Sequence, residues 1–126
     1  MIDHVTLNVR DLSKSKRFYA EALIPLGYRV VAEYSGGLGL GSGPKADVWL
    51  TRREPVTAGM HLAFQCGTRS LVEAFHAAAL KAGGRDNGAP GVRKDYGPHY
   101  YGAFVLDPDG NNIEAVCQEP APAARK

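Results

Sequence analysis

The feature that most constrains the fold of this chain is an internal repeat. When the sequence is shifted by 57 residues against itself, several positions carry the same residue without a gap. They fall at equivalent points of one strand-then-helix pattern, which indicates two copies of a single supersecondary unit. The identical pairs are His4 and His61, Ser13 and Ser70, Phe18 and Phe75, Ala20 and Ala77, Ala22 and Ala79, Leu23 and Leu80, and Gly27 and Gly84.

Each half of the repeat is predicted to hold a short alternating strand, a capped helix and then further strands. Asp11 and Thr68 lie where the two helices need a side chain that accepts a hydrogen bond from a free backbone N–H group. The second half also carries a longer loop over residues 87–99. The predicted elements are a strand over 4–9, a helix over 12–23 and strands over 28–34, 37–40 and 46–51, then a strand over 61–66, a helix over 70–81, a weak strand around Arg85 and strands over 101–106 and 112–116.

These elements make each half a βαβββ module, and two such modules predict an α+β fold. The modules are expected to form a cupped mixed sheet with the helices on its outer face. At 126 residues the chain is long enough for one domain with an ordinary hydrophobic core. We expect module 1 over about residues 1–55, module 2 over about 57–118 and a flexible tail over 119–126.

The composition narrows the possible functions. The formal net charge is only +2 and the charges are evenly spread, which argues against a nucleic-acid partner. No stretch has the length of a membrane span, and the chain does not open with the uninterrupted apolar segment of a signal peptide. Two cysteines, Cys66 and Cys117, do not make a disulfide framework, so we expect a cytoplasmic protein with reduced thiols.

Alternation along the strands predicts which residues face away from the helices. The first strand of each module alternates apolar residues with polar ones that include His4 or His61, and in the last strand Ile113 and Ala115 alternate with Glu114. If the apolar sides pack on the helices, then His4, His61 and Glu114 share the opposite surface. A carboxylate inside a strand with apolar neighbours is unfavourable unless it is paired, and the two histidines are its candidate partners.

Two imidazoles and one carboxylate on one concave face are a suitable donor set for a divalent metal such as Fe, Mn, Zn, Ni or Co. Three protein ligands would leave coordination positions open for water or substrate, as catalytic sites require. A single histidine at the start of a strand is more often a surface or hydrogen-bonded residue. The repeat offset and the shared face with Glu114 favour the metal-ligand interpretation of His4 and His61.

Several motifs resemble the vicinal oxygen chelate superfamily, which includes glyoxalase I, extradiol dioxygenases, fosfomycin-modifying thiol transferases and bleomycin-binding proteins. The resemblance covers about residues 1–118 and implies that His4, His61 and Glu114 hold the metal and that the protein is a homodimer. It leaves open whether the three ligands come from one chain or from two. The matching stretches are IDHVTLNV (2–9), DL (11–12) before FY (18–19), LGY (26–28), HLAF (61–64) and FVLDPDGNNIE (104–114).

The chain departs from the glyoxalase I pattern at one position. Glyoxalase I is similar but has a fourth protein ligand on the last strand of its first module, where this sequence carries Trp49. Tryptophan cannot bind a metal, and Asp47, two residues away, is a weak substitute. The three-ligand set is similar to extradiol dioxygenases, which usually carry two such domains, and to thiol transferases, which carry cationic residues after the final Glu that this chain lacks. The reaction therefore stays open.

Other candidate site residues lie on the loop of module 2 and on the concave face. His99 is a candidate general acid or base, and Tyr96, Tyr100 or Tyr101 are candidate hydrogen-bond donors to a bound oxyanion, with Tyr101 preferred as a catalytic residue. Arg93 and Lys94 would attract an acidic substrate, but the sequence favours solvated surface charges at these two positions, whereas for His99 and Tyr101 a functional role and an ordinary surface loop are equally consistent. The candidate substrate pocket consists of Asn8, Trp49, Thr51 and Tyr96.

The function that this pattern favours is that of a metal-dependent enzyme whose metal acts as a Lewis acid on a small substrate with two neighbouring oxygens. The reaction would be of the lyase, isomerase or dioxygenase type, with Glu114 taking part as both ligand and catalytic residue. The alternative is a non-enzymatic protein of the bleomycin-resistance type that sequesters a drug or another ligand in its cleft. A third possibility is a scaffold that keeps the ligands but has lost access to substrate.

Overall fold

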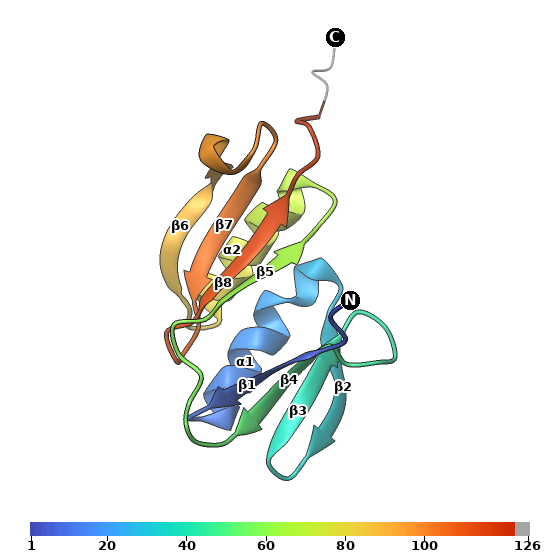
Figure 1. Ribbon diagram of the computed structural model, residues 1–126, viewed down its shortest axis with the longest axis vertical. Helices are drawn as coiled ribbons and strands as arrows, with labels where there is room; N and C mark the ends of the chain where they lie inside the picture. Colours follow the sequence, from blue (N-terminus) through green and yellow to red (C-terminus); the bar gives the residue numbers. More distant parts are fainter. Residues whose placement is uncertain (123–126) are drawn as a thin grey trace.

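The computed structural model describes residues 1–122, which form two βαβββ modules, each with its own four-stranded sheet (Figure 1). The α+β class and the order of elements are confirmed. Of the predicted tail, residues 119–122 belong to no helix or strand, and 123–126 lie outside the described residues. The elements are β1 (Val5–Val9), α1 (Leu12–Ala22), η1 (Ile24–Leu26), β2 (Arg29–Tyr34), β3 (Gly37–Gly41) and β4 (Val48–Arg52), then β5 (His61–Gln65), α2 (Arg69–Lys81), β6 (Arg85–Val92), η2 (Lys94–Tyr96), β7 (Tyr101–Leu106) and β8 (Asn112–Cys117).

The two sheets have the same topology. Their strand orders are β1-β4-β3-β2 and β5-β8-β7-β6, and in each the first strand of the module is parallel to the last while the other pairs are antiparallel. The register is also the same, because Thr6 lies opposite Trp49 and Ala63 lies opposite Glu114. Trp49 in module 1 therefore occupies the position that Glu114 occupies in module 2.

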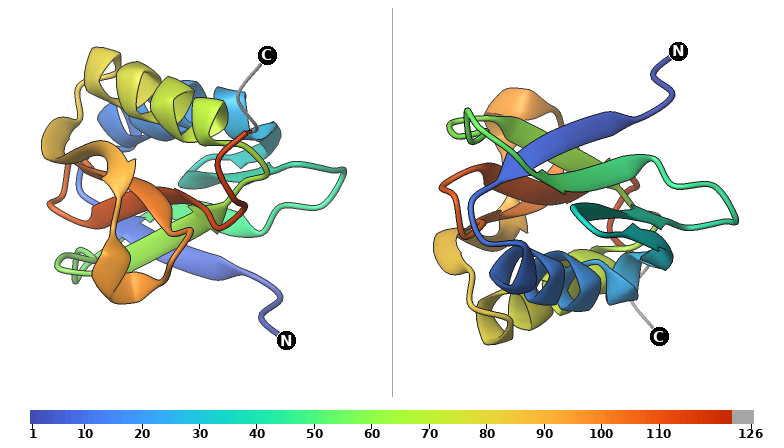
Figure 2. Two further views of the ribbon diagram at one scale, coloured as in Figure 1. Left: turned by 90° about the horizontal axis from the view of Figure 1, so that it is seen from above. Right: turned by 90° about the horizontal axis from the view of Figure 1, so that it is seen from below.

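Both helices begin at the capping residues that the sequence indicates. The Asp11 side chain accepts a hydrogen bond from the Lys14 N–H group, and the Thr68 side chain accepts one from the Leu71 N–H group. Figure 2 shows the two helices together on one side of the strands. Within residues 1–122, no helix is long and apolar enough to span a membrane.

A shared core joins the two modules. Phe18 and Tyr19 on α1 are fully buried, and the Tyr19 hydroxyl donates a hydrogen bond of 2.6 Å to Asp107 in the turn between β7 and β8. The rings of Tyr28 and Phe64, one from each module, meet edge to face with their centroids 5.4 Å apart. Asp107 also accepts a hydrogen bond from the backbone N–H group of Asp109, so the turn that positions β8 is tied to α1.

One strand differs from the sequence prediction. A weak strand was expected around Arg85 followed by a loop, but β6 runs on to Val92 and pairs with β7, with register shifts on either side of Gly88. Asn, Gly, Ala and Pro are poor strand formers, so the composition of this segment hides the strand. Gly88 lies opposite Phe104, where a Cβ atom would approach the phenyl ring to 2.8 Å. A larger residue would disturb this pairing.

Candidate metal centre

Glu114 is the centre of a small polar cluster on the face of the second sheet that points away from the helices. Its side chain is fully buried, and its neighbours in the sheet are Ala63 on β5 and Phe104 on β7. One carboxylate oxygen, Oε1, lies 2.7 Å from Nε2 of His61, and the other, Oε2, accepts a hydrogen bond from the Tyr100 hydroxyl. Both oxygens are therefore paired, as a buried carboxylate requires.

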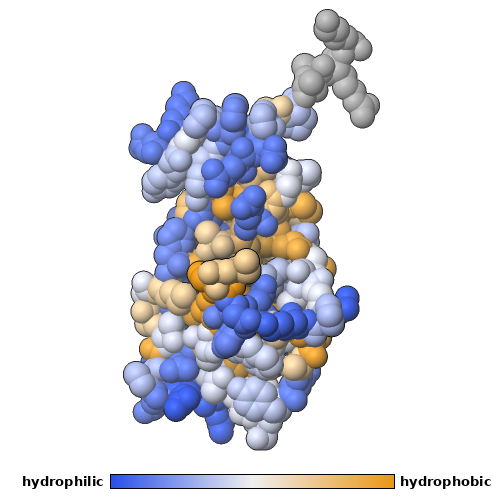
Figure 3. All heavy atoms as spheres, turned by 45° about the vertical axis from the view of Figure 1, so that its right-hand side comes forward, coloured by the Kyte–Doolittle hydropathy of each residue, from blue (hydrophilic) through white to orange (hydrophobic). Residues whose placement is uncertain are grey.

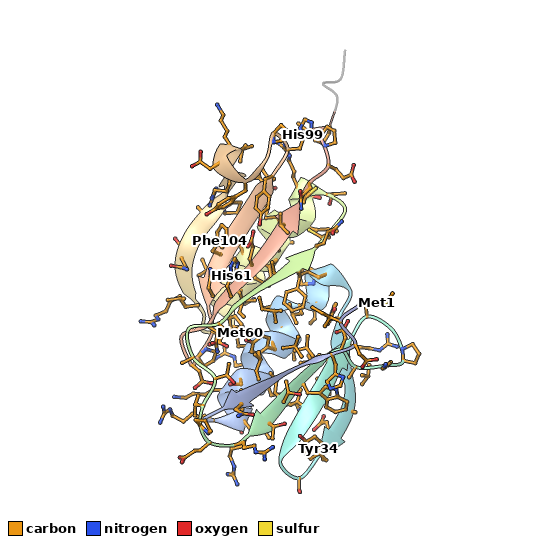
Figure 4. All side chains as sticks on the ribbon, viewed as in Figure 1. Met1, Tyr34, Met60, His61, His99 and Phe104 are labelled. Atoms are coloured by element: carbon orange, nitrogen blue, oxygen red, sulfur yellow. The ribbon has the colours of Figure 1, made fainter. Side chains whose placement is uncertain are left out.

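His61 connects this buried carboxylate to the surface. It lies at the start of β5, and 53% of its side chain is exposed, whereas Glu114 is fully buried. Leu62 and Phe64, its alternating neighbours, belong to or pack against the hydrophobic core. The predicted alternation therefore holds here, and Figure 4 shows His61 beside Phe104 in the middle of the molecule. Their ring centroids are 6.1 Å apart.

Tyr100 holds the second carboxylate oxygen. Burial, together with the hydrogen bond to Glu114, raises the pKa of Tyr100 well above its usual range. The phenol therefore stays protonated and remains a hydrogen-bond donor at any ordinary pH. The Tyr96 ring packs edge-on against the Tyr100 ring with centroids 5.2 Å apart, which connects η2 to the cluster.

His4 lies apart from this cluster, directly before β1 of the other sheet. Its Nδ1 atom is 2.7 Å from Asp3 Oδ1, and 52% of its side chain is exposed. Lys45 and His4 both bind Asp3 and hold the pKa of that carboxyl below its usual range. In Figure 4, His61 lies near the middle of the molecule, whereas Met1, three residues before His4, lies at its right-hand edge. Across residues 1–122, no group of three or more His, Cys, Asp and Glu side chains is arranged to hold a metal ion.

The predicted pocket residues Asn8, Trp49 and Thr51 lie in the first sheet, whose strand β1 follows His4. Thr51 shares a hydrogen bond of 2.7 Å with the Tyr34 hydroxyl, and the Asn8 amide donates one of 3.0 Å to the Pro55 carbonyl. Trp49 is half-buried, and its ring centroid lies 6.4 Å from that of Tyr34. The structure therefore divides the candidate residues between two sheets.

Of the remaining candidates on the second module, Tyr96 packs against Tyr100 of the cluster and Arg93 lies over the Phe104 ring. Tyr101 lies on the helix-facing side of β7, where its hydroxyl donates a hydrogen bond of 2.7 Å to Glu73 and its ring packs under Arg69. His99 is exposed at the end of the loop, far from His61 in Figure 4. Sequence reasoning overlooked Phe104, which the strand pattern could have identified because it lies opposite Glu114 in the β7–β8 hairpin.

The chemistry of the paired side chains suits a divalent metal. The imidazole nitrogen of His61 and the carboxylate oxygen of Glu114 are donors that Fe, Mn, Zn, Ni and Co accept, and they already point at one another. Two donors do not make a stable catalytic site, which needs at least three. The described part of one chain thus supplies the His61–Glu114 pair and, separately, His4.

Comparison with known proteins agrees with the fold. A family model described as the Glyoxalase/Bleomycin resistance protein/Dioxygenase superfamily matches residues 1–115. The crystal structure of a glyoxalase/bleomycin resistance protein from Albidiferax ferrireducens T118 is 31% identical with a TM-score of 0.78, and the match covers 90% of this chain and 95% of that one. No curated protein gives a significant match.

More distant structures share the fold alone. A lactoylglutathione lyase from Agrobacterium tumefaciens is 16% identical with a TM-score of 0.67, over 93% of this chain and 92% of that one. A glyoxalase I mutant from Zea mays is 24% identical with a TM-score of 0.70, over 94% of this chain and 44% of that one. Together with the family match over residues 1–115, these findings show that the chain belongs to the glyoxalase/bleomycin resistance protein/dioxygenase superfamily.

Proposed function

We propose that this protein is a metal-dependent enzyme that acts on a small substrate with two neighbouring oxygen atoms. A homodimer would hold each metal ion with His61 and Glu114 of one chain and His4 of the partner subunit. The observation that carries the proposal is the buried Glu114 carboxylate, which is paired with a half-exposed imidazole on the face away from the helices.

Stability alone does not account for Glu114. Removing a carboxylate from water costs several kcal/mol, and an apolar residue of similar size often gives an equally stable core. Glu114 is fully buried, and an imidazole and a phenol are the groups that bind it. Buried ionisable groups with specific partners are common at functional sites, because chemistry needs the charge that the fold would otherwise avoid.

The surroundings of His4 resemble those of a metal-binding histidine, although His61 and Glu114, the other candidate ligands of the metal centre, lie apart from it in the same chain. Its Nδ1 atom is bound to Asp3, which leaves Nε2 as the free nitrogen on a half-exposed ring. Metal-binding histidines commonly bind a carboxylate through the other ring nitrogen, because that contact fixes the tautomer and orients the ring. The Asp3–His4 pair is therefore consistent with a ligand presented to another chain.

A two-fold dimer would unite the separated residues. If the first sheet of one chain faces the second sheet of its partner, the symmetry creates two equal sites, each with residues from both chains. The identical topology of the two sheets supports such an arrangement. Figure 3 shows hydrophobic residues across the middle of one face, and the exposed large apolar side chains include Ile2 and Tyr34 of module 1. Such residues favour an interface.

A metal bound in this site would supply Lewis acidity to the two substrate oxygens. The residues of the chain would prepare the site for it. Tyr100 fixes Oε2 of Glu114, so that Oε1 remains directed at His61. Histidine and carboxylate side chains bind a metal in their deprotonated forms, so metal affinity should rise with pH. Whether the reaction is of the lyase, isomerase or dioxygenase type depends on the metal.

Two free cysteines, Cys66 and Cys117, support a cytoplasmic location.

Metal analysis tests the proposal directly. Protein purified without chelators should carry about one divalent metal per chain, and His61→Ala and Glu114→Ala should lower the content to near zero because each removes one of three ligands. His99→Ala is the matched control, since His99 is exposed and far from His61, and it should bind metal like the wild type. Equal, low metal contents in all four proteins would refute the enzyme proposal.

The aromatic residues of both sheets favour one alternative function. Trp49 and Tyr34 lie on the first sheet and Phe104 on the second, and they would give a dimer cleft flat apolar walls. Such a cleft suits a protein of the bleomycin-resistance type, which sequesters a ligand without chemistry. In that case ligand binding would survive the Glu114→Gln substitution and would not depend on added metal.

A further inference from the structure

A half-buried arginine lies in a hollow beside the His61–Glu114 pair. The hollow has a volume of about 390 Å³ and is on the same side of the second sheet as Glu114. The Arg93 guanidinium lies over the Phe104 ring, with Cζ 5.3 Å from the ring centroid. The hollow is lined by Asn87, Gly88, Arg93, Tyr96, Phe104 and Asn112.

Several features hold the guanidinium in place. Nη2 of Arg93 donates a hydrogen bond of 2.6 Å to the Ala89 carbonyl, and stacking on Phe104 restricts the plane of the group. Two glycines leave room for it, because a Cβ atom would lie 2.9 Å from Nη1 at Gly91 and 3.2 Å from Nη2 at Gly88. Strand β6 thus leaves space for the guanidinium, and its pairing with β7 is irregular on either side of Gly88.

This ordered cation has no counter-charge. Within residues 1–122, no carboxylate forms an ion pair with Arg93, and Asp86 on the preceding strand β6 is bound to His76 at 3.0 Å. An arginine has five N–H donors, and the contact with Ala89 uses only one of the two Nη groups. Asn87 and Asn112, joined by a hydrogen bond of 3.2 Å, add amide groups to the same hollow. The site offers donors that match an anion.

The arginine is also close to the candidate metal centre. Phe104 lies directly opposite Glu114 in the β7–β8 pair, where adjacent strands are about 4.8 Å apart. The His61 ring centroid is 6.1 Å from that of Phe104, and Asn112 lies opposite His61. A single phenyl ring therefore separates Arg93 from the His61–Glu114 pair.

We propose that Arg93 binds an anionic group, a carboxylate or a phosphoryl group, of the substrate. The substrate is then a small organic acid whose anion pairs with the Arg93 guanidinium while its neighbouring oxygens reach the metal that His61 and Glu114 would help to hold. The substrate class rests on the proposed function, but the anion subsite itself requires no metal.

The subsite can be tested on metal-free protein. Inorganic phosphate and, in a second arm, acetate would be titrated into ¹⁵N-labelled protein while the backbone signals of Gly88 and Gly91 and the side-chain Nε signal of Arg93 are followed. We expect saturable shifts, with affinity at least about tenfold weaker in Arg93→Gln because a charge-assisted hydrogen bond is lost. Lys94→Gln is the matched control, since Lys94 is the exposed neighbouring cation, and it should bind like the wild type.

The two arms and one further variant decide the outcome. Arg93→Lys keeps the positive charge but loses the planar guanidinium, so the anion affinity of this variant should lie between those of wild type and Arg93→Gln. If Arg93→Gln does not fold, Arg93→Lys takes its place in the comparison with wild type. Stronger binding of phosphate than of acetate would identify a phosphoryl group, and the reverse a carboxylate. No saturable shift at these signals, or equal binding by wild type and Arg93→Gln or Arg93→Lys, would overturn the inference. Metal binding without anion binding would refute only the subsite, and anion binding without metal only the enzyme.

Discussion

At the scale of single residues, Glu114 shows how a buried charge is accommodated. Its two oxygens are bound by His61 and by Tyr100, which come from opposite sides of β8. The face on which Glu114 lies could be predicted, because alternation in a strand depends only on residue number. Its partner Tyr100 could not be singled out from its neighbours, because Tyr100 precedes β7 and its direction depends on the loop before it.

Adjacent tyrosines provide a controlled test of this cluster. Tyr100→Phe should lower the free energy of unfolding by about 1–3 kcal/mol, because a buried carboxylate oxygen loses its donor. Tyr101→Phe removes a hydrogen bond to the exposed Glu73 on the other side of the sheet and should have a clearly smaller effect. Urea unfolding monitored by circular dichroism measures both values. Equal effects would mean that Tyr100 does not hold Glu114.

Tyr28 predicts a dependence of stability on alkaline pH. Burial, together with a hydrogen bond to Asp47, raises the pKa of Tyr28 to about 12 from the ordinary tyrosine value of 10.0. At a pH between these two pKa values, the unfolded chain has lost the phenolic proton of Tyr28 while the folded chain keeps it. The free energy of unfolding therefore falls as pH rises through this range. Urea unfolding would be measured between pH 9 and pH 12, about the range of the two pKa values. The free energy of unfolding should fall more steeply with pH in the wild type than in Tyr28→Phe. Parallel curves would contradict this assignment.

At the scale of elements, β3 shows how a glycine-rich strand fits against an aromatic residue. Leu38 and Leu40 enter the core, while Gly39 faces the other way and lies opposite Trp49. A Cβ atom at Gly39 would come within 2.8 Å of the Trp49 ring. The alternation of Gly and Leu in this strand therefore serves both faces of the sheet.

Replacing Gly39 should disturb Trp49. Gly39→Ala should lower the free energy of unfolding by about 1–3 kcal/mol through overpacking and should shift the fluorescence of Trp49, the single tryptophan of the chain. Gly43→Ala is the control, because a Cβ atom there has no neighbour within 4 Å. Unchanged fluorescence and stability in Gly39→Ala would show that Trp49 does not pack on β3 as described.

The helices and strands that can be predicted from the sequence are those with a regular hydrophobic pattern. The two helices and strand β7 were predicted well, because their apolar residues recur with a clear period and Asp11 and Thr68 mark the helix starts. Most of β6 was missed, because it has two register shifts and few apolar residues. It is held by pairing with β7 and by the fit of Gly88 against Phe104, which depend on residues distant in sequence.

At the scale of the whole molecule, the candidate site is divided. The sequence placed His4, His61 and Glu114 on the side of the strands away from the helices, but alternation cannot tell which sheets meet one another. The structure puts Trp49 and Asn8 in the first sheet, with His4 directly before its strand β1, and His61 with Glu114 in the second. In the proposed homodimer, the first sheet of one chain would face the second sheet of its partner and so complete the site.

Mixing two inactive variants tests this claim most directly. His4→Ala and His61→Ala would each be purified, mixed in equal amounts, exchanged under mild denaturant and assayed for bound metal. If the ligands come from two chains, each mixed dimer has one intact site, so the mixture should hold about one metal for every four chains while either variant alone holds almost none. If the mixture binds no more metal than the separate variants although mixed dimers have formed, the shared metal centre does not exist.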